Sequence, residues 1–480
     1  MNRYIVIGCL AASVALFDMC AVNPVTGKKQ VVLMSEAQEI EMGKSADPEI
    51  IAQYGLYEDK TLQDFINQKG KEMAAVSHRP NLDYHFRIVD SDILNAFAIP
   101  GGYVYFTRGI MAHFNNEAEF AGVLGHEIGH VTARHSVIQQ RNAMLGQIGL
   151  IAGMVVAPEL GEFAQTASQG LSLLFLKFGR DDERQSDQLG AEYSSRIGYD
   201  AEEMAGFFNT LERKTAQSGS EALPSFLSTH PNPGDRNVAV SKAAKEWKQK
   251  LSMNSPKVGR DTYLKRIEGL IYGEDPKQGF VESNVFYHPV LKLQFSIPSG
   301  WATHNSPQSF QMASKDGKAM MILSMAQSKT LQDASAEVLK KYALTAIESK
   351  EVTVNGLPAL SVVADQKQEQ GTTLRTLSYL IQYGGSIYHL IGVSSSADYS
   401  NHAGTFSSTM QSFKQLTDAA KLNKKPERVR IKTVKSTGTF EQALKSFNAP
   451  AKRYEEFAIL NGLQLKEQVR AGSLIKVIEY

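Results

Sequence analysis

Two histidines separated by three residues, with a glutamate directly after the first, form the segment His126-Glu127-Ile128-Gly129-His130. The surrounding residues favour a helix, on which side chains four residues apart lie on the same face. Two imidazoles at that spacing can bind one Zn²⁺, and the neighbouring carboxylate can reach a metal-bound water. We therefore expect His126 and His130 to be metal ligands and Glu127 to be the general base of a hydrolytic reaction.

A catalytic zinc ion also needs a third protein ligand and one open position. Residues 180–187 begin a charged helix in which Glu183 and Asp187, four residues apart, share a face. We expect Glu183 to be the third ligand, and Asp187 to accept a hydrogen bond from a ligand imidazole and so fix its tautomer. The alternative is a solvent-exposed helix start, but two like charges at that spacing repel and offer no gain in stability.

A loop over residues 228–236 supplies two further candidates, His230 and Arg236, together with two prolines that restrict its backbone. We expect His230 to stabilise the oxyanion of the tetrahedral intermediate. Alternatively, His230 ligates zinc in a resting state and blocks the water position, or it is an ordinary loop histidine. Arg236 is expected to orient the substrate or to pair with a carboxylate.

The other histidines considered are not expected to be metal ligands. At 100° per residue, a helical His135 would lie about 180° around the helix from His126 and about 140° from His130. It could not join their face. His78 and His113 are similarly unpromising.

A protease must also hold an extended peptide, and addition to a sheet edge satisfies the peptide backbone without reading its side chains. The expected edge is the segment Asn95-Ala96-Phe97-Ala98-Ile99, just before Pro100-Gly101-Gly102. This mode predicts broad specificity for unfolded chains.

Hydrophobic periodicity indicates the elements that position these residues. Helical patterns cover residues 35–52, 62–76, 117–144, 180–197 and 201–214, and strand patterns cover 82–89 and 103–107. An apolar, glycine-rich stretch over 145–158 and a helical stretch over 163–176 form an insertion between two of the helices. The apolar stretch fits core packing, a mobile flap over the cleft or a hairpin that touches a membrane, and it is too short to span one.

The bulk composition limits the classes of function. A chain of 480 residues is too long for one hydrophobic core, so several domains are expected. Hydrophobic residues make up 42% and charged residues 21%, and the net charge is +1 with no long run of either sign. These values indicate globular domains and no basic surface for a nucleic-acid partner.

Composition and pattern predict the order of domains. In order, they are a domain with the candidate site residues over 21–250, a linker over 251–282, an α/β sandwich over 283–415, a linker over 416–427 and a small strand–helix–helix–strand module over 428–480. Within the sandwich, helical patterns lie at 334–349 and 403–413, and the remaining segments alternate as strands do.

The N-terminus predicts export. Arg3 precedes an apolar run over residues 4–17, too short for a comfortable membrane span, and Cys20 follows. This layout resembles a bacterial lipoprotein signal over 1–20, with Cys20 as the lipidated residue, although Phe17-Asp18-Met19 lacks the usual small residues. An ordinary export signal and an uncleaved anchor are the alternatives. We expect a periplasmic protein attached to the outer membrane through a lipid on Cys20.

The motifs at 126–130, 183–187 and 229–231 stand in the order seen in HtpX/BepA-type zinc metalloendopeptidases, and residues 23–245 resemble that family. Further matching segments are 23–28, 95–102, 119–125 and 198–200. The resemblance implies a mainly α, zincin-like peptidase domain with a small sheet and one Zn²⁺ per chain. It also implies endopeptidase activity on misfolded or unassembled envelope proteins.

The C-terminal part departs from that family. BepA-type members carry helical tetratricopeptide repeats after the peptidase domain, and the sequence here shows none. Residues 428–480 instead resemble a LysM module, which implies peptidoglycan binding, with a degenerate module used only for packing as the alternative. The middle domain faintly resembles PsbP/Mog-like sandwiches, a likeness that implies no function.

Two classes of function are consistent with these features. One is a zinc endopeptidase in envelope quality control, and the other is a cell-wall-bound chaperone or scaffold that grips unfolded chains, with gated or incidental proteolysis. An intact Glu127 favours the endopeptidase, because gripping alone needs no general base. An aminopeptidase would need an acidic anchor for the substrate amine, which the sequence does not reveal.

Overall fold

The computed structural model describes residues 20–31, 34–143, 150, 151, 154, 155, 157, 160, 163, 178–218, 226–230, 236–368 and 371–480. Residues 1–19 of the signal sequence expected over 1–20 and most of the apolar insertion lie outside these residues. Cys20 begins strand β1 (Cys20–Val22), which pairs with β2 (Lys29–Val31). Within the described part of the chain, no helix has both the length and the apolar character needed to cross a membrane.

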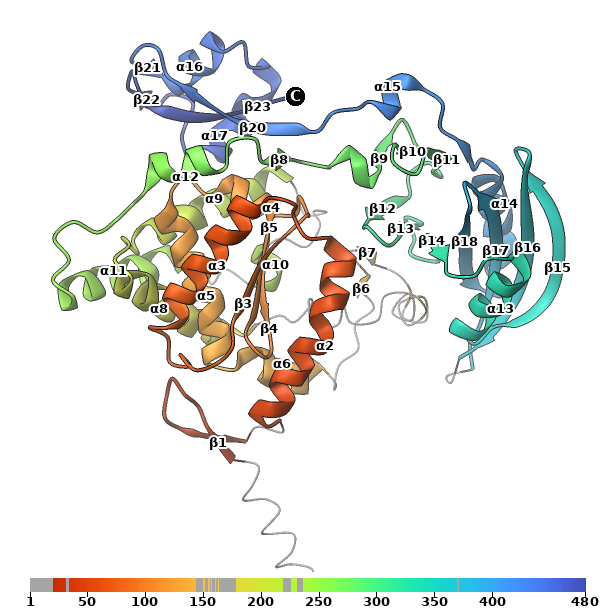
Figure 1. Ribbon diagram of the computed structural model, residues 1–480, viewed down its shortest axis with the longest axis horizontal. Helices are drawn as coiled ribbons and strands as arrows, with labels where there is room; N and C mark the ends of the chain where they lie inside the picture. The colour runs from red at the N-terminus through yellow and green to blue at the C-terminus, as the bar shows by residue number, and fades with distance from the viewer. Residues whose placement is uncertain are drawn as a thin grey trace, which may run out of the picture.

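The first half of the chain is mainly helical, as expected, and surrounds a small sheet (Figure 1). Its helices are α2 (Glu36–Tyr54), α3 (Lys60–Ala74), α4 (Arg108–His113), α5 (Glu117–Thr132), α6 (His135–Ala143), α8 (Arg180–Arg196), α9 (Glu203–Ser218), α10 (Phe226–Thr229) and α11 (Arg236–Lys250). The short strands β6 (Leu150–Ile151) and β7 (Met154–Val155) form a pair between α6 and α8.

The small sheet has the strand order β3-β5-β4. Strand β3 (His85–Val89) runs parallel to β5 (Tyr103–Thr107), and β4 (Ala96–Ile99) runs antiparallel to it. The turn between β4 and β5 needs glycine, because Gly101 and Gly102 have φ angles of 83° and 92°. In the order β3-β5-β4, strand β4 lies at an edge of the sheet, where the sequence analysis placed it.

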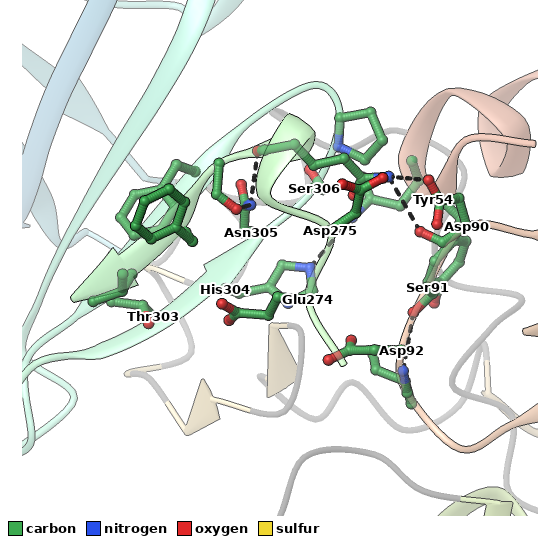
Figure 2. Close-up of a pocket in the computed structure, with 18 of the residues that line it drawn as sticks. Tyr54, Asp90, Ser91, Asp92, Glu274, Asp275, Thr303, His304, Asn305 and Ser306 are labelled. Carbon is green, nitrogen blue, oxygen red and sulfur yellow. Dashed lines mark hydrogen bonds between the residues drawn. The ribbon is translucent and has the colours of Figure 1, made fainter. Parts of the chain in front are cut away.

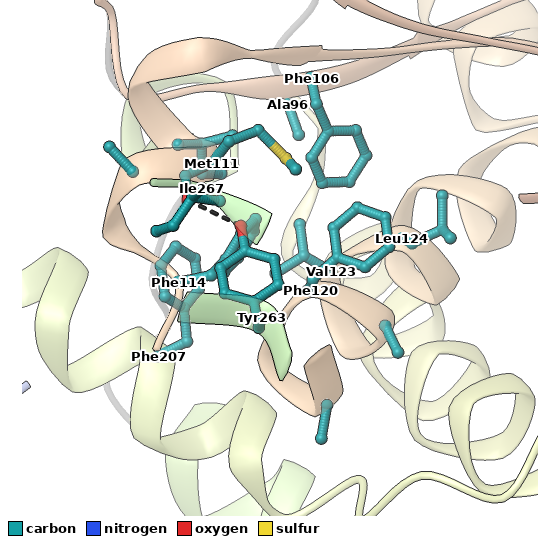
Figure 3. Packing of buried hydrophobic residues seen from close by; sticks show 14 of the residues in the cluster. Ala96, Phe106, Met111, Phe114, Phe120, Val123, Leu124, Phe207, Tyr263 and Ile267 are labelled. Carbon is teal, nitrogen blue, oxygen red and sulfur yellow. Dashed lines mark hydrogen bonds between the residues drawn. The ribbon is translucent and has the colours of Figure 1, made fainter. Parts of the chain in front are cut away.

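The core of this region includes a segment that was expected to be a linker. Helix α12 (Arg260–Arg266) places Tyr263 among aromatic residues of α5 and α9, and the Tyr263 hydroxyl donates a hydrogen bond of 2.7 Å to Met111 O (Figure 3). Strand β8 (Ile271–Tyr272) follows and pairs with β20 of the C-terminal module. The structure differs here from the predicted linker over 251–282. Although the composition of this segment is polar, it contains apolar residues that are buried in the core: Tyr263, Leu264, Ile267 and Leu270.

The middle of the chain is rich in strands. Its main sheet has the order β12-β13-β14-β18-β17-β16-β15, and a smaller sheet has the order β19-β11-β10-β9. The bounds are β9 (Phe280–Glu282), β10 (Val285–His288), β11 (Leu293–Ser296), β12 (Ala302–Asn305), β13 (Phe310–Ala313), β14 (Ala319–Ala326), β15 (Thr345–Val354), β16 (Leu357–Lys367), β17 (Thr373–Tyr383), β18 (Ser386–Ser395) and β19 (Lys414–Gln415). Helices α13 (Leu331–Lys341) and α14 (Tyr399–Gln411) pack against the main sheet.

One helix in the middle of the chain is shorter than expected. The pattern over 334–349 predicted a helix throughout, but α13 ends at Lys341 and β15 begins at Thr345. Ala343 takes a φ of 48° in the turn between them. Strand β15 gains its backbone partners from β16, a tertiary pairing that helical periodicity does not register.

The junction between the helical and strand-rich parts surrounds a cavity of about 120 Å³ (Figure 2). Gln278 joins the two parts: its Nε2 donates to Asp90 Oδ2 at 2.6 Å, and its carbonyl accepts from Asn305 Nδ2 at 2.9 Å. Asp90 also forms an ion pair of 2.5 Å with Arg108, which partly neutralises the acidic side chains that line this cavity.

The C-terminal module contains the expected first strand, two helices and last strand, and two further short strands flank the helices. Its elements are β20 (Glu427–Thr433), β21 (Gly438–Thr439), α16 (Phe440–Ser446), α17 (Tyr454–Leu460), β22 (Gln468–Val469) and β23 (Leu474–Glu479). The module lies against α12 and α9, and its apolar residues share one core with the helical first half of the chain (Figure 1). The assignment to LysM and the domain boundaries stay predictions.

Candidate metal centre

Helix α5 presents two of the candidate ligands. Asn116 caps its N-terminus by accepting a hydrogen bond from Glu119 N, and its apolar residues pack into the core. The His126 and His130 side chains are fully buried and approach each other with their Nε2 atoms 3.0 Å apart. The spacing of four residues thus produces the pair of imidazoles expected from the sequence.

Helix α8 brings a carboxylate to this pair. Glu183 lies in the first turn of α8 and is fully buried. Its Oε1 is 3.4 Å from His130 Nε2, and its Oε2 is 3.6 Å from His126 Nε2. The carboxyl group therefore lies beside both rings, as the ligand hypothesis requires.

Glycines allow α8 to pack closely on α5. A Cβ added at Gly190 of α8 would lie 2.9 Å from Gly122 O and 3.1 Å from His126 N. Because the first contact is shorter than real Cβ contacts and involves backbone, the helices would have to separate.

We expect Gly190→Ala to lower the free energy of unfolding by about 1–3 kcal/mol and to weaken metal binding, because it pushes Glu183 away from the histidines. The matched control is Gly206→Ala in α9, where an added Cβ has no atom within 4 Å among the described residues. That change should stabilise the chain by about 0.5–1 kcal/mol. Denaturant unfolding and metal titration of both variants test this, and equal behaviour of the two would contradict it.

His230 joins the same cluster. It follows helix α10, and its Nδ1 lies 2.9 Å from Glu183 Oε1 and 3.2 Å from His126 Nε2. Phe226 stacks on its ring with centroids 4.4 Å apart. The two prolines expected to restrict the loop after His230 lie outside the described residues. His230 therefore lies where a ligand would lie, in accord with the resting-state alternative for this residue.

The resulting cluster fits one metal ion. Ligand atoms of His126, His130, Glu183 and His230 all lie within 4.8 Å of one another. Burial lowers the pKa of His130 well below its usual value, which keeps the ring neutral, the form that binds metal. Ring nitrogens that converge on one carboxylate favour a shared cation.

Asp187 and Arg236 form a second layer behind His126. Asp187 Oδ1 lies 2.9 Å from His126 Nδ1, the contact that the sequence predicted. Arg236 donates from Nε and Nη2 to the two oxygens of Asp187 at 2.8 and 2.6 Å. The Arg236 side chain is buried, so the geometry matches the carboxylate-pairing alternative rather than contact with substrate.

Glu127 lies beside the cluster of candidate ligands. Its Oε1 is 3.7 Å from His230 Nε2, and neither of its buried oxygens has a hydrogen-bond partner among the described residues. Burial raises the pKa of the Glu127 carboxyl. An unpaired carboxyl group at this place is available to accept a proton.

His135 contributes no atom to the ligand cluster, as expected, but the helix geometry behind that expectation is wrong. It assumed one continuous helix, but α5 ends at Thr132, and Arg134 takes a φ of 61° before α6 begins at His135. The break turns His135 back, so that its Nδ1 lies 3.1 Å from His130 Nδ1. His78 and His113 stay outside the cluster: their Nδ1 atoms bond to Tyr193 Oη and to Gly109 O.

The candidate substrate edge lies close to these elements. Strand β4 contacts α5, and Ala98 O accepts a hydrogen bond of 3.2 Å from the Ser136 hydroxyl. Phe97 stacks on Tyr105 with ring centroids 4.9 Å apart. Asn95, Ala96, Phe97 and Ala98 are at most 8% exposed in this structure.

Residues 61–244 match the Peptidase family M48, and they span the whole cluster from His126 to His230. This segment is an M48 peptidase domain. The chain is 28% identical over 264 residues to the Beta-barrel assembly-enhancing protease of Escherichia coli (strain K12), a match that covers 53% of each chain. It is 30% identical over 214 residues to the Mitochondrial metalloendopeptidase OMA1 of Arabidopsis thaliana, covering 43% of this chain and 42% of that protein.

The M48 domain is thus the shared part: the chain spans about half the length of these relatives. Among solved structures, the PsbP of Synechocystis sp. PCC 6803 matches 27% of this chain and 91% of its own, with 10% identity and a TM-score of 0.23. A similarity of that size supports no conclusion about the region outside the M48 domain.

Proposed function

We propose that this chain is a zinc-dependent endopeptidase that hydrolyses peptide bonds in misfolded or unassembled proteins of the cell envelope. The observation that carries this proposal is the buried convergence of His126, His130 and Glu183, with an unpaired Glu127 beside them. The relatives named as proteases share the M48 domain that contains these residues.

The ligands of the zinc ion would be His126, His130 and Glu183. When bound, zinc supplies a Lewis acid that polarises the scissile carbonyl and lowers the pKa of water. Glu127 takes the proton of the attacking water and delivers it to the departing amine, and its raised pKa suits it to holding that proton. Asp187 holds the ring of His126, and Arg236 holds Asp187.

His230 gives this site a resting state. Its Nδ1 lies among the ligand atoms, so in this arrangement His230 would act as a further ligand to a bound zinc ion and keep water away from it. Displacement of His230 would open that ligand position, and the same imidazole could then stabilise the oxyanion.

The substrate would bind as an added strand along β4. Phe97 pairs with Tyr105 on β5, and Ala98 O turns away from β5 to accept from the Ser136 hydroxyl, a hydrogen bond that an added strand would have to replace. Backbone pairing of this kind accepts many sequences, which suits a protease for unfolded chains. Export, a lipid on Cys20, outer-membrane attachment and peptidoglycan binding by residues 428–480 belong to this proposal, and the sequence motifs support them.

Removal of the metal tests the proposal. The purified full-length chain should degrade casein, and a chelator such as 1,10-phenanthroline should reduce the rate at least ~100-fold, because the metal supplies several kcal/mol of transition-state stabilisation. Addition of Zn²⁺ after removal of the chelator should restore the rate, whereas Mg²⁺ should not, because nitrogen ligands disfavour it. Cleavage that is insensitive to the chelator would overturn the zinc mechanism.

A further inference from the structure

We propose that His135 is a positioning residue for the metal ligand His130: its Nδ1 accepts a hydrogen bond from His130 Nδ1–H and so fixes the tautomer that presents Nε2 to the metal. This inference rests on the proposed function, because it concerns the same site. It assigns a role to a buried histidine that contributes no atom to the ligand cluster.

The two nitrogens of His130 face opposite partners. Its Nε2 lies 3.0 Å from His126 Nε2 and 3.4 Å from Glu183 Oε1, on the side of the ring that faces the ligand cluster. Its Nδ1 lies 3.1 Å from His135 Nδ1, on the far side. A neutral imidazole that ligates through Nε2 must carry its proton on Nδ1, so His130 is the donor in this contact and His135 is the acceptor.

The surroundings of His135 favour the matching tautomer. If Nδ1 of His135 accepts, its own proton lies on Nε2, and that atom is 2.9 Å from the amide oxygen of Gln185, which can only accept. Asp182 Oδ1 lies 3.6 Å from the same nitrogen and also favours a proton there. The Ser186 hydroxyl, 3.3 Å from His135 Nδ1, also favours an unprotonated Nδ1, and it shares that nitrogen's single lone pair with the His130 donor at 3.1 Å.

The two histidines of α5 therefore have second-layer partners of different chemistry. His126 Nδ1 donates to the carboxylate of Asp187, which is itself held by Arg236. His130 Nδ1 donates to a neutral imidazole. Groups in this layer orient the ligand ring, and their loss commonly weakens metal binding by about 10–100-fold.

The backbone break that brings His135 to this place is held by buried charges. Arg134, with its φ of 61°, donates from Nη2 to Met34 O and pairs through Nε with Glu39 Oε2 at 3.0 Å. Glu39 is fully buried and also pairs with Arg79, whose Nη1 donates to Val131 O at the end of α5. A left-handed arginine persists only where its surroundings impose it, so this network determines where His135 lies.

The first test measures zinc affinity by competition with a chromophoric chelator. His135→Leu should weaken zinc binding by about 10–100-fold, because it removes the acceptor. His135→Asn should stay within about threefold of the unmodified chain, since its amide oxygen takes the place of Nδ1. His78→Asn is the control, because His78 bonds to Tyr193 outside the cluster.

The second test uses the unmodified chain and so does not depend on the folding of a variant. In the zinc-loaded protein with ¹⁵N-labelled histidine, long-range ¹H–¹⁵N spectra should show His130 protonated on Nδ1 and His135 protonated on Nε2. A His135 protonated on Nδ1, or a folded His135→Leu with unchanged zinc affinity, would overturn this role alone. Failure of the unmodified chain to bind zinc would instead overturn the proposed function, and the role of His135 with it.

Discussion

The Glu127→Gln variant is expected to bind zinc as tightly as the unmodified chain and to lose at least ~10³-fold in kcat/KM toward unfolded casein. Glutamine has nearly the shape of glutamate, so the ligand geometry of His126, His130 and Glu183 is preserved. An amide cannot accept the proton of the attacking water, and the other carboxyl groups described at the cluster already have charged or ring partners: Glu183 contacts His230 and Arg236, and Asp187 contacts His126 and Arg236.

The control for this experiment is Glu192→Gln on α8. Glu192 pairs with Arg196 on the surface of the same domain and is not one of the cluster residues. The activity of the Glu192→Gln chain should therefore stay within twofold of that of the unmodified chain. Metal content and kcat/KM are measured for both variants. A Glu127→Gln chain that keeps more than about a tenth of the activity would remove Glu127 from the role of general base.

The same variant separates the two classes of function considered from the sequence. If Glu127→Gln retains zinc, loses proteolysis and still supports every function of the chain in cells, then gripping of unfolded chains is its main task. The endopeptidase predicts the opposite, because a chain that binds substrate without cleaving it cannot clear misfolded proteins.

The candidate site was largely predictable because it depends on short-range helix geometry. His126 with His130 and Glu183 with Asp187 are pairs four residues apart, and each pair needs only a local helix to share a face. The hypothesis then required that the two helices meet. Gly190, which allows α8 to approach α5, satisfies that requirement, but its role could not be read from the sequence.

His135 shows where such reasoning fails. Its position depends on the turn at Arg134, which is held by Glu39, a residue that lies 95 positions earlier in the chain. No local pattern indicates a helix break there, because residues 130–136 contain neither glycine nor proline. The burial of α12 in the expected linker has a similar origin: Tyr263 is recognisable as a core residue only once Phe114 and Phe207 surround it.

The Lys476→Met variant should lower the free energy of unfolding by about 2–5 kcal/mol, because it leaves the buried carbonyls of Ala112 and Phe114 without their donor, at about 1–3 kcal/mol each. Lys476 lies on β23 of the C-terminal module and is fully buried. Its Nζ donates hydrogen bonds of 2.9 Å to Ala112 O and Phe114 O, in the connection that leads from α4 into α5.

Glu119 in the first turn of α5 is the acidic partner in this environment. Burial raises the pKa of Glu119 to about 8 and lowers the pKa of Lys476 to about 7, because each charge is removed from water. Attraction between the two charges opposes both shifts. With these pKa values Glu119 is largely uncharged at pH 7, so the link between α5 and the C-terminal module depends on the hydrogen bonds of Lys476 rather than on a full ion pair.

Two comparisons make the Lys476 prediction decisive. Lys466→Met, at an exposed position of the same module, should change the free energy of unfolding by no more than about 0.5 kcal/mol. The double variant Glu119→Gln/Lys476→Met should be less destabilised than the sum of the single changes, because each single change already removes the attraction between the two groups. Denaturant unfolding of the full chain measures these three variants and the single variant Glu119→Gln, and a Lys476→Met effect as small as that of Lys466→Met would show that the C-terminal module does not support α5.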